Sequence, residues 1–176
     1  MKVNNTKFKG LKVIHSTNFE DRRGFFRESF LKKFFKNNNF VFQCISKSKK
    51  NVLRGLHLQT KFPQGKYVSV LKGKILDVAI DLRKNSKTFG KHFKIELSSK
   101  NAKSIFIPEG FAHGFVSLSF ESIVHYSCTN YRSAKHEIGI MWNDKDLKIK
   151  WPVKKPITSK KDSNNISFKQ FKKFYL

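Results

Sequence analysis

Residues 52–59 hold an arginine and a histidine three positions apart in a mostly apolar stretch, Val-Leu-Arg-Gly-Leu-His-Leu-Gln. Histidine can take up a proton near neutral pH, and arginine can stabilise an anion through paired N–H donors. The alternation predicts a strand, which would place Arg54 and His57 on opposite faces. Both could still reach one cavity if the strand twists or ends at Gly55. A histidine among leucines is more often structural than catalytic, so His57 requires partners elsewhere in the chain.

Residues 108–113 are a second candidate site, because they follow the pattern Pro-x-Gly-x-x-His. This pattern resembles the second motif of cupins, small jelly-roll barrels with a pocket inside the barrel. In metal-binding cupins the first motif supplies a His-x-His pair, since a divalent ion needs several converging donors. The corresponding place here is His57-Leu58-Gln59, which lacks the second imidazole. We therefore expect a metal-free pocket, with a metal-dependent cupin enzyme built on His57, Gln59 and His113 as an alternative.

The elements that would position these residues are mostly short strands. Apolar and alternating runs bounded by turn residues predict strands at residues 8–15, 40–45, 52–59, 67–71, 75–81, 93–97, 105–107, 111–118, 122–129 and 138–142. We expect residues 40–45 to be buried, and Gly73 to form the turn of a hairpin between 67–71 and 75–81. Short helices are expected at 29–36 and 167–175.

Many short strands and few helices indicate an antiparallel sandwich or barrel. With the cupin-like motif, the expected fold is all-β, a cupin-type antiparallel jelly-roll barrel with a few short helices. We expect one domain over residues 1–176, in which 153–176 form a looser C-terminal segment.

The net charge of +25 at pH 7 would ordinarily suggest a nucleic-acid partner. The chain, however, has 31 lysines and 6 arginines, whereas phosphate clamps favour arginine. We expect no nucleic acid as partner, and an anionic small ligand instead. No apolar run is long enough for a membrane span, and no signal core follows Met1, so a cytoplasmic protein without a membrane partner is expected. Cys44 and Cys128 are expected to be reduced, buried thiols.

A series of longer motifs then resembles the dTDP-4-dehydrorhamnose 3,5-epimerase family. The resemblance runs in order over nearly the whole chain and is carried by residues 21–28, 52–57, 64–68, 77–83, 88–91, 107–115, 142–144 and 151–152. It implies a cofactor-free isomerase that inverts C3 and C5 of a dTDP-4-keto-6-deoxy sugar by proton transfer through an enolate.

The resemblance also assigns roles within this reaction, which needs a base, an acid and donors at the C4 oxygen. His57 matches the base, and Asp162 matches the carboxylate paired with it. Tyr126 matches the acid on the opposite face, with Tyr131 as a competing candidate for that role and for substrate contact. Lys66 matches the donor to the enolate, and two further side chains are expected near it, Arg54 and His113.

Nucleotide binding is implied for a separate segment near the N-terminus. Arg23 and Glu28 match residues that contact dTDP in the family, and Phe19 or Phe25 could stack on the thymine. Family members are homodimers with strands exchanged between subunits, so Arg23 or its neighbours could serve the partner's pocket.

Three departures from the family pattern leave the substrate open. The family's Gln-x-Asn is replaced by Gln43-Cys44-Ile45, although Gln43 remains a candidate substrate contact. Leu58 stands where an aromatic residue often follows the base, and Asn51 replaces a glycine. The alternatives are a C3-only or other nucleotide-sugar epimerase, the metal-dependent cupin enzyme, and a non-enzymatic barrel that binds an anion, carbohydrate or nucleic acid.

Overall fold

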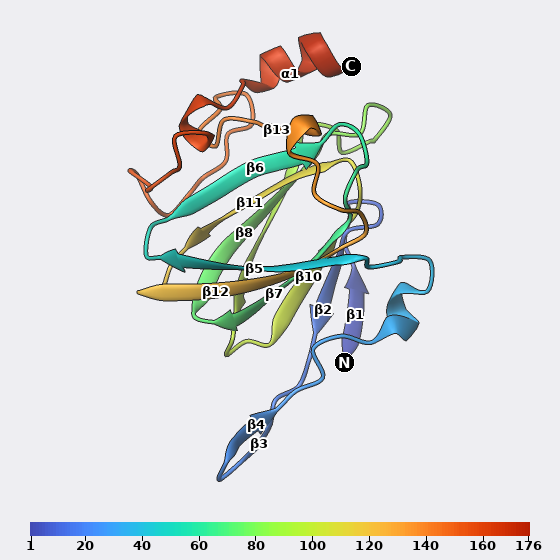
Figure 1. Ribbon diagram of the computed structural model, residues 1–176, viewed down its shortest axis with the longest axis vertical. Coiled ribbons are helices and arrows are strands. Elements are labelled where there is room, and N and C mark those ends of the chain that lie inside the picture. The colour runs from blue at the N-terminus through green and yellow to red at the C-terminus, as the bar shows by residue number, and fades with distance from the viewer.

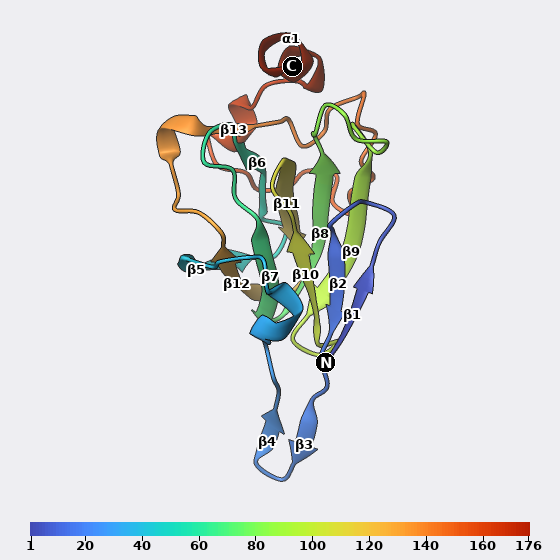
Figure 2. The same ribbon diagram turned by 90° about the vertical axis from the view of Figure 1, so that its right-hand side faces the viewer.

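Two antiparallel sheets lie face to face in the computed structural model, which describes residues 1–176 (Figures 1 and 2). The six-stranded sheet has the order β1 (Lys2–Asn5), β2 (Lys12–His15), β10 (Lys103–Ile107), β7 (Lys66–Lys72), β12 (Glu121–Cys128), β5 (Phe42–Lys49). The five-stranded sheet has the order β13 (Glu137–Gly139), β6 (Leu53–Gln59), β11 (Phe111–Ser117), β8 (Lys74–Asp81), β9 (His92–Ser98). The predicted all-β, antiparallel jelly-roll class is confirmed.

The main core lies between the two sheets. Strand alternation directs every second side chain inward, as with Val68 and Val70 of β7 and Phe111 and Phe115 of β11. Twelve buried side chains form this core: Phe8, Leu11, Val68, Val70, Ile75, Ala79, Leu97, Ile105, Ile107, Phe111, Phe115 and Val124. The apolar core fills only part of the barrel interior, and a cavity with polar side chains occupies the remainder.

The outer face of each sheet is covered by a chain segment. Aromatic residues around the 3₁₀ helix η1 (Lys32–Phe35) pack on Tyr67 and Phe106 of the six-stranded sheet. The C-terminal helix α1 (Phe168–Tyr175) packs Phe168 and Phe171 against the five-stranded sheet. Two more 3₁₀ helices are η2 (Ala134–His136) and η3 (Asp162–Asn164). None of the helices has the length and apolar character needed to cross a membrane.

A small hairpin of β3 (Phe19–Asp21) and β4 (Gly24–Phe26) projects from the barrel (Figures 1 and 2). Three phenylalanines on it, Phe19, Phe25 and Phe26, are all more than half exposed. The hairpin therefore presents aromatic surface that its own barrel does not cover.

The predicted hairpin around Gly73 is wrong. Gly73 does form a turn, with φ of +79°, but β7 and β8 lie in different sheets. β8 pairs instead with β9 and β11. An added Cβ at Gly73 would lie 2.2 Å from the Glu121 carbonyl oxygen, so this corner requires glycine. The alternating pattern of each strand was identified, but it does not specify the pairing partner.

Other element predictions succeeded in part. The C-terminal helix is confirmed, and Ser167 caps it through a reciprocal pair of hydrogen bonds with Gln170. The helix at 29–36 is wrong, because these aromatic residues pack in several directions and only Lys32–Phe35 form a 3₁₀ turn. The strand expected at 40–45 runs instead over Phe42–Lys49 at a sheet edge and is mostly exposed. Cys44 is consequently exposed, contrary to expectation, whereas Cys128 is buried.

Candidate active site

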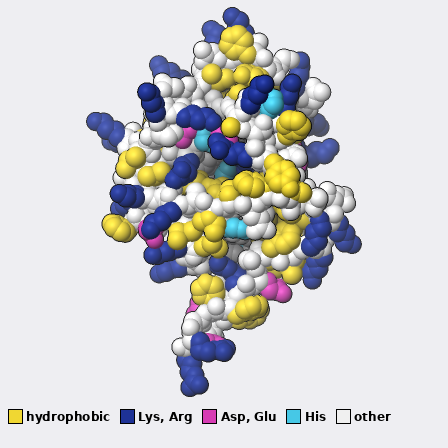
Figure 3. All heavy atoms as spheres, viewed as in Figure 1, with side chains coloured by type: hydrophobic (Ala, Val, Ile, Leu, Met, Phe, Trp, Pro, Cys, Tyr) yellow, Lys and Arg dark blue, Asp and Glu magenta, His cyan; other side chains and the backbone are white.

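A cavity of about 520 Å³ opens between the two sheets. Histidine side chains are visible in a hollow of the face shown in Figure 3, with Lys and Arg side chains around it. The polar and ionisable groups that line the cavity are Cys44, Arg54, His57, Gln64, Lys66, His113, Tyr126, Cys128, Arg132, Glu137, Thr158, Ser159, Lys161 and Asp162. Six of the residues predicted from the sequence are among them: Arg54, His57, Lys66, His113, Tyr126 and Asp162.

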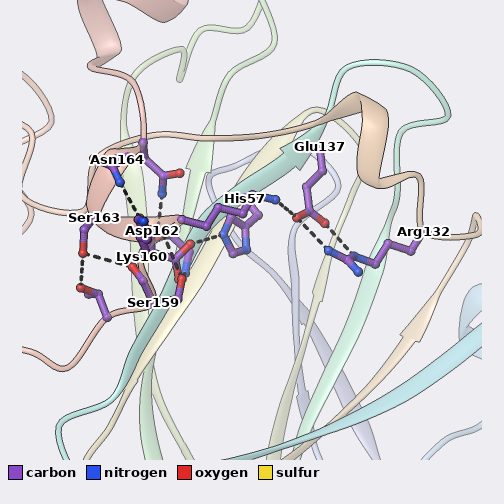
Figure 4. Close-up of polar contacts among 12 residues, drawn as sticks. His57, Arg132, Glu137, Ser159, Lys160, Asp162, Ser163 and Asn164 are labelled. Carbon is purple, nitrogen blue, oxygen red and sulfur yellow. Dashed lines mark hydrogen bonds and ion pairs between the residues drawn. The ribbon is translucent and has the colours of Figure 1, made fainter.

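His57 on β6 and Asp162 on η3 form a close pair (Figure 4). A hydrogen bond of 2.6 Å joins His57 Nε2 to Asp162 Oδ1. Burial would raise the pKa of Asp162, but the bonds from His57, the Gly55 N–H and Ser159 outweigh it and lower that pKa. An ionised carboxylate only accepts hydrogen bonds, so Nε2 is the donor in a neutral ring and Nδ1 is left able to take a proton.

Arg54 reaches the same cavity because the strand is irregular at Gly55. In the pairing of β6 with β11, His57 lies opposite His113 and Arg54 opposite Phe115. β6 therefore has one more residue than β11 between these pairs. This bulge places Arg54 and His57 on the same face of β6. The Arg54 Nε then donates to Ser48 Oγ at 3.0 Å, and Nη2 donates to the Lys47 carbonyl at 2.9 Å. These bonds hold the guanidinium against β5 at the cavity wall.

Gly55 is required by the same bulge. Its φ is +115°, and an added Cβ would lie 2.6 Å from both the Gly114 Cα and the His113 carbonyl oxygen. Only glycine lets β6 and β11 approach this closely.

His113 on β11 pairs with Asp77 on β8. Their Nε2 and Oδ2 atoms are 2.8 Å apart, and both side chains are buried. The other carboxylate oxygen, Asp77 Oδ1, has no hydrogen-bond partner. His113 is consequently held through Nε2 by a buried carboxyl group, which leaves Nδ1 as its free ring nitrogen at the cavity.

Tyr126 and Lys66 come from the six-stranded sheet, opposite the sheet of His57. The Tyr126 hydroxyl lies 3.3 Å from Ser46 Oγ, and its ring packs edge-on against His113. Burial raises the pKa of Tyr126, so the phenol remains protonated at neutral pH. Burial also lowers the pKa of Lys66, although nearby carboxylates and thiols oppose that effect. The cavity thus holds a protonated phenol and a desolvated amine opposite the histidine–aspartate pair.

Glu137 on β13 joins two cations at the cavity wall (Figure 4). It accepts from Arg132 Nε at 3.1 Å and from Lys161 Nζ at 2.5 Å. Burial alone would raise the pKa of Glu137, but these bonds and the charge of His57 lower it to about 2. Glu137 is therefore a second carboxylate near His57.

Five predicted substrate-binding residues do not line this cavity: Phe19, Arg23, Glu28, Gln43 and Tyr131. Arg23 lies on the projecting hairpin, where it pairs with Asp21. Gln43 points to the outer face of β5, because Phe42 and Cys44 take the inward positions, and it bonds His125. Tyr131 is exposed in the loop after β12. Within one chain, these side chains and the cavity are separate.

The sequence interpretation assigned no role to several groups at the cavity or behind it: Cys44, Asp77, Cys128, Arg132, Glu137 and Lys161. Asp77 had a usable signal, since it is the sole acidic residue within the apolar run 75–80. A carboxylate in a buried strand requires a partner. Glu137 and Lys161 had no comparable signal, because their contact depends on the path of the C-terminal segment.

In both histidines of the metal hypothesis, one of the two ring nitrogens is engaged by a carboxylate. Nε2 of His57 is bonded to Asp162 and Nε2 of His113 to Asp77. Gln59, the third residue of the metal hypothesis, bonds the Phe62 carbonyl and the Ser133 N–H outside the cavity. No group of three or more His, Cys, Asp or Glu side chains is placed to share a metal ion.

The arrangement suits proton transfer at a carbon next to a carbonyl. The cavity brings together the His57 imidazole, which has the chemistry of a base, a protonated phenol from the other sheet, and the nitrogen-bearing side chains of Arg54, Lys66 and His113, which are of the kind that can stabilise a developing oxyanion.

Known proteins are similar to this chain in sequence and in fold. The family model for dTDP-4-dehydrorhamnose 3,5-epimerase matches residues 5–170. The enzyme of that name from Methanothermobacter thermautotrophicus is 45% identical over 166 residues, which cover 90% of both chains. The crystal structure of the Elizabethkingia anophelis enzyme superposes with a TM-score of 0.90 at 45% identity, covering 97% of both chains.

A Legionella pneumophila 3,5-epimerase was solved in complex with dTDP-4-keto-L-rhamnose, and it has a TM-score of 0.91 at 41% identity. This match covers 94% of the present chain and 92% of that one. The resemblance inferred from the sequence is confirmed, and the chain belongs to the dTDP-4-dehydrorhamnose 3,5-epimerase family.

Proposed function

We propose that this protein inverts C3 and C5 of a dTDP-4-keto-6-deoxy sugar, the activity named for its relatives. The observation that carries the proposal is the His57–Asp162 pair, which shares one cavity with Tyr126 and three N–H donor side chains. The chemistry needs no group beyond these side chains, so we include cofactor independence in the proposal.

The first step is removal of a proton from C3. Nδ1 of His57 takes this proton, and the C–H electron pair forms a C3–C4 double bond while the carbonyl pair moves to the C4 oxygen. Lys66, Arg54 and His113 donate to the resulting enolate, and Asp162 stabilises the imidazolium. One such donor is typically worth about 3 kcal/mol of transition-state stabilisation.

The second step returns a proton to the opposite face of C3. Tyr126 supplies it, because it reaches the cavity from the other sheet and burial keeps the phenol protonated. The enolate collapses to the ketone, and exchange with solvent restores both side chains. The same sequence at C5 completes the double inversion.

The nucleotide is assigned to the projecting hairpin of a second subunit. Arg23 and the aromatic Phe19 or Phe25 belong to this hairpin, Glu28 follows it in the chain, and none of them lines the cavity of their own chain. The exposed phenylalanines of that hairpin support a homodimer in which it covers the partner's barrel. In that arrangement Arg23 would bind the pyrophosphate of a sugar held mostly by the partner.

We also assign the protein to the cytoplasm. Its two cysteines are unpaired, and Cys44 is exposed, which suits a reducing compartment.

The test is to incubate the protein with dTDP-4-keto-6-deoxyglucose in heavy water and follow the sugar by NMR. The proposal predicts deuterium at both C3 and C5 with inversion at each. Exchange at C3 alone would indicate a C3-only epimerase, and exchange at neither would reject the proposal for this sugar. Activity lost on chelation and restored by iron or manganese would instead favour the metal-dependent alternative.

A further inference from the structure

A second cavity, of about 480 Å³, lies at the loops that join β1 to β2 and β8 to β9. Its 7 lining residues are all polar, and none of them is acidic. Four are cations: Lys7, Lys9, Arg83 and Lys87. The cavity of His57 shares none of the residues that line this one. The second cavity therefore has the charge expected of a separate site for an anion.

The two loops are held in shape by a buried carboxylate. Asp81, at the end of β8, is fully buried and accepts four hydrogen bonds, from Arg83 Nε and Nη2, Ser86 Oγ and Thr88 Oγ1. Arg83 also donates through Nη1 to the Lys9 carbonyl at 2.9 Å, which joins the β8–β9 loop to the β1–β2 loop (Figure 2). The cavity is thus formed by the fold itself, so a ligand need not order these loops in order to bind.

Three of the four cations have no anionic partner in the chain. Asp81 neutralises Arg83, but Lys7, Lys9 and Lys87 take part in none of the nine ion pairs. All three lysines are exposed. The backbone N–H groups of Asn85 and Lys87, two of the lining residues, also have no acceptor within the chain. The loops therefore combine three uncompensated positive charges with two unused N–H donors.

The chemistry of the lining selects the kind of anion. A lysine ammonium binds phosphate oxygens as a compact point charge. A single phosphate group carries at most about two negative charges at pH 7, fewer than the three free lysines, whereas a short chain of linked phosphates carries more. No apolar or aromatic side chain lines the cavity, so it offers no surface on which a nucleotide base or a lipid chain could pack. The lining therefore fits the phosphate chain itself.

We propose that this second cavity is a binding site for a free inorganic phosphate chain, such as pyrophosphate or tripolyphosphate, held by Lys7, Lys9 and Lys87. The site is separate from the active site and its ligand is not the sugar nucleotide, so the inference does not depend on the proposed function. It also gives a role to three lysines of a chain whose net charge is +25.

The test is an NMR titration of the isotope-labelled protein with sodium tripolyphosphate at about 150 mM salt, where weak surface attraction is screened. Each backbone amide reports separately, so binding at the active site is distinguished from binding at the second cavity. The amides of residues 7–9 and 83–88 should shift together and saturate. The proposal is overturned if these amides show no saturable shift, or if the shifts lie only outside the two loops.

A double variant tests the lysines. Lys9→Glu with Lys87→Glu should weaken the binding read at the Asn85 amide by about tenfold or more, because each change reverses a charge beside the phosphates. Lys154→Glu with Lys155→Glu is the matched control: it makes the same change in net charge at exposed residues outside both cavities. Its affinity should change by less than about twofold. Equal weakening in the two double variants would show attraction to the net charge alone and would overturn the proposal.

Two further ligands distinguish the sources of a phosphate chain. Adenosine triphosphate should bind at the same amides more weakly than tripolyphosphate, because its chain is esterified at one end and its base meets no apolar surface. Tighter binding of adenosine triphosphate would overturn the assignment in favour of a nucleotide site. Tighter binding of a single-stranded DNA oligomer at these amides would overturn it in favour of a nucleic-acid surface.

Discussion

His57 Nε2 and Asp162 Oδ1 lie 2.6 Å apart although 105 residues separate them in the chain. β6 supplies the histidine, and the C-terminal segment returns across that strand to supply the aspartate. The aspartate side chain is 5% exposed and the histidine 25%, so the carboxylate is shielded while the ring still opens to the cavity. This is the geometry expected of a base that is oriented by a buried acid.

Asp162→Asn should leave the fold intact and slow the reaction. The amide keeps the size of the side chain but removes the charge that stabilises the His57 imidazolium. We expect kcat to fall by about 10² to 10⁴ with a near-normal circular dichroism spectrum. An equally active variant in steady-state assays would show that the pair is structural.

Tyr126→Phe should separate proton removal from proton return. His57 can still remove the C3 proton, so deuterium exchange at C3 should persist while net inversion falls by about 10² or more. Tyr131→Phe should have little effect, because Tyr131 is exposed outside the cavity. If instead Tyr131→Phe abolishes inversion and Tyr126→Phe does not, the acid is Tyr131, reached through a dimer.

Asp81 should account for part of the loss of folding stability at acidic pH. It is fully buried, bonded to Arg83, Ser86 and Thr88, and these bonds outweigh desolvation and lower its pKa to about 2 from 3.8. Because the folded pKa is depressed, this stabilisation is complete above the unfolded pKa and is lost as pH falls from about 4 to 2. Its size is about 2 kcal/mol at neutral pH.

The check is thermal unfolding of Asp81→Asn against wild type. The variant should have a lower Tm at pH 7, and the difference should narrow toward pH 2. Asp21→Asn is the control, since its pair with Arg23 lies on the exposed hairpin and its loss should leave Tm unchanged. A Tm difference between Asp81→Asn and wild type that stays constant from pH 7 to pH 2 would contradict this explanation.

Phe26→Ser should weaken the proposed dimer. Phe26 is the most exposed of the hairpin phenylalanines at 69%, and covering it by a partner would bury apolar area. Analytical ultracentrifugation should show wild-type dimers and a shift toward monomers in the variant, with a raised KM for the nucleotide sugar. Phe174→Ser on α1, at 62% exposure, should remain dimeric. A monomeric wild type would contradict the assignment of Arg23 to a partner's pocket.

The strand pattern could be predicted because alternating apolar residues follow local periodicity. The partners of the strands could not, and β7 and β8 show why: Gly73 marks a turn equally well for a hairpin and for a corner between sheets. Strand alternation likewise predicted Arg54 and His57 on opposite faces. The bulge at Gly55 reversed that relation, and alternation alone does not show that Gly55 takes a φ of +115° and lies close against β11.

The members of the cavity were partly predictable through the family resemblance. Asp162 stands in a lysine-rich tail with no local sign of burial, yet the tail crosses β6 and the carboxylate meets His57. Glu137 and Lys161 were not identified, because charged residues in polar stretches of the sequence give no sign that the fold will place them at a cavity. In the proposed dimer the hairpin residues Phe19 and Arg23 act in the cavity of a second subunit, and the sequence of one chain does not show how two subunits pack.

The most direct test of the account is deuterium exchange by His57→Asn. The asparagine keeps a polar side chain at the cavity wall but cannot act as the base. The account predicts that exchange at C3 in heavy water falls by about 10² to 10⁴ while dTDP still binds, whereas His136→Asn, outside the cavity, exchanges as wild type. Exchange at the wild-type rate in His57→Asn would contradict it.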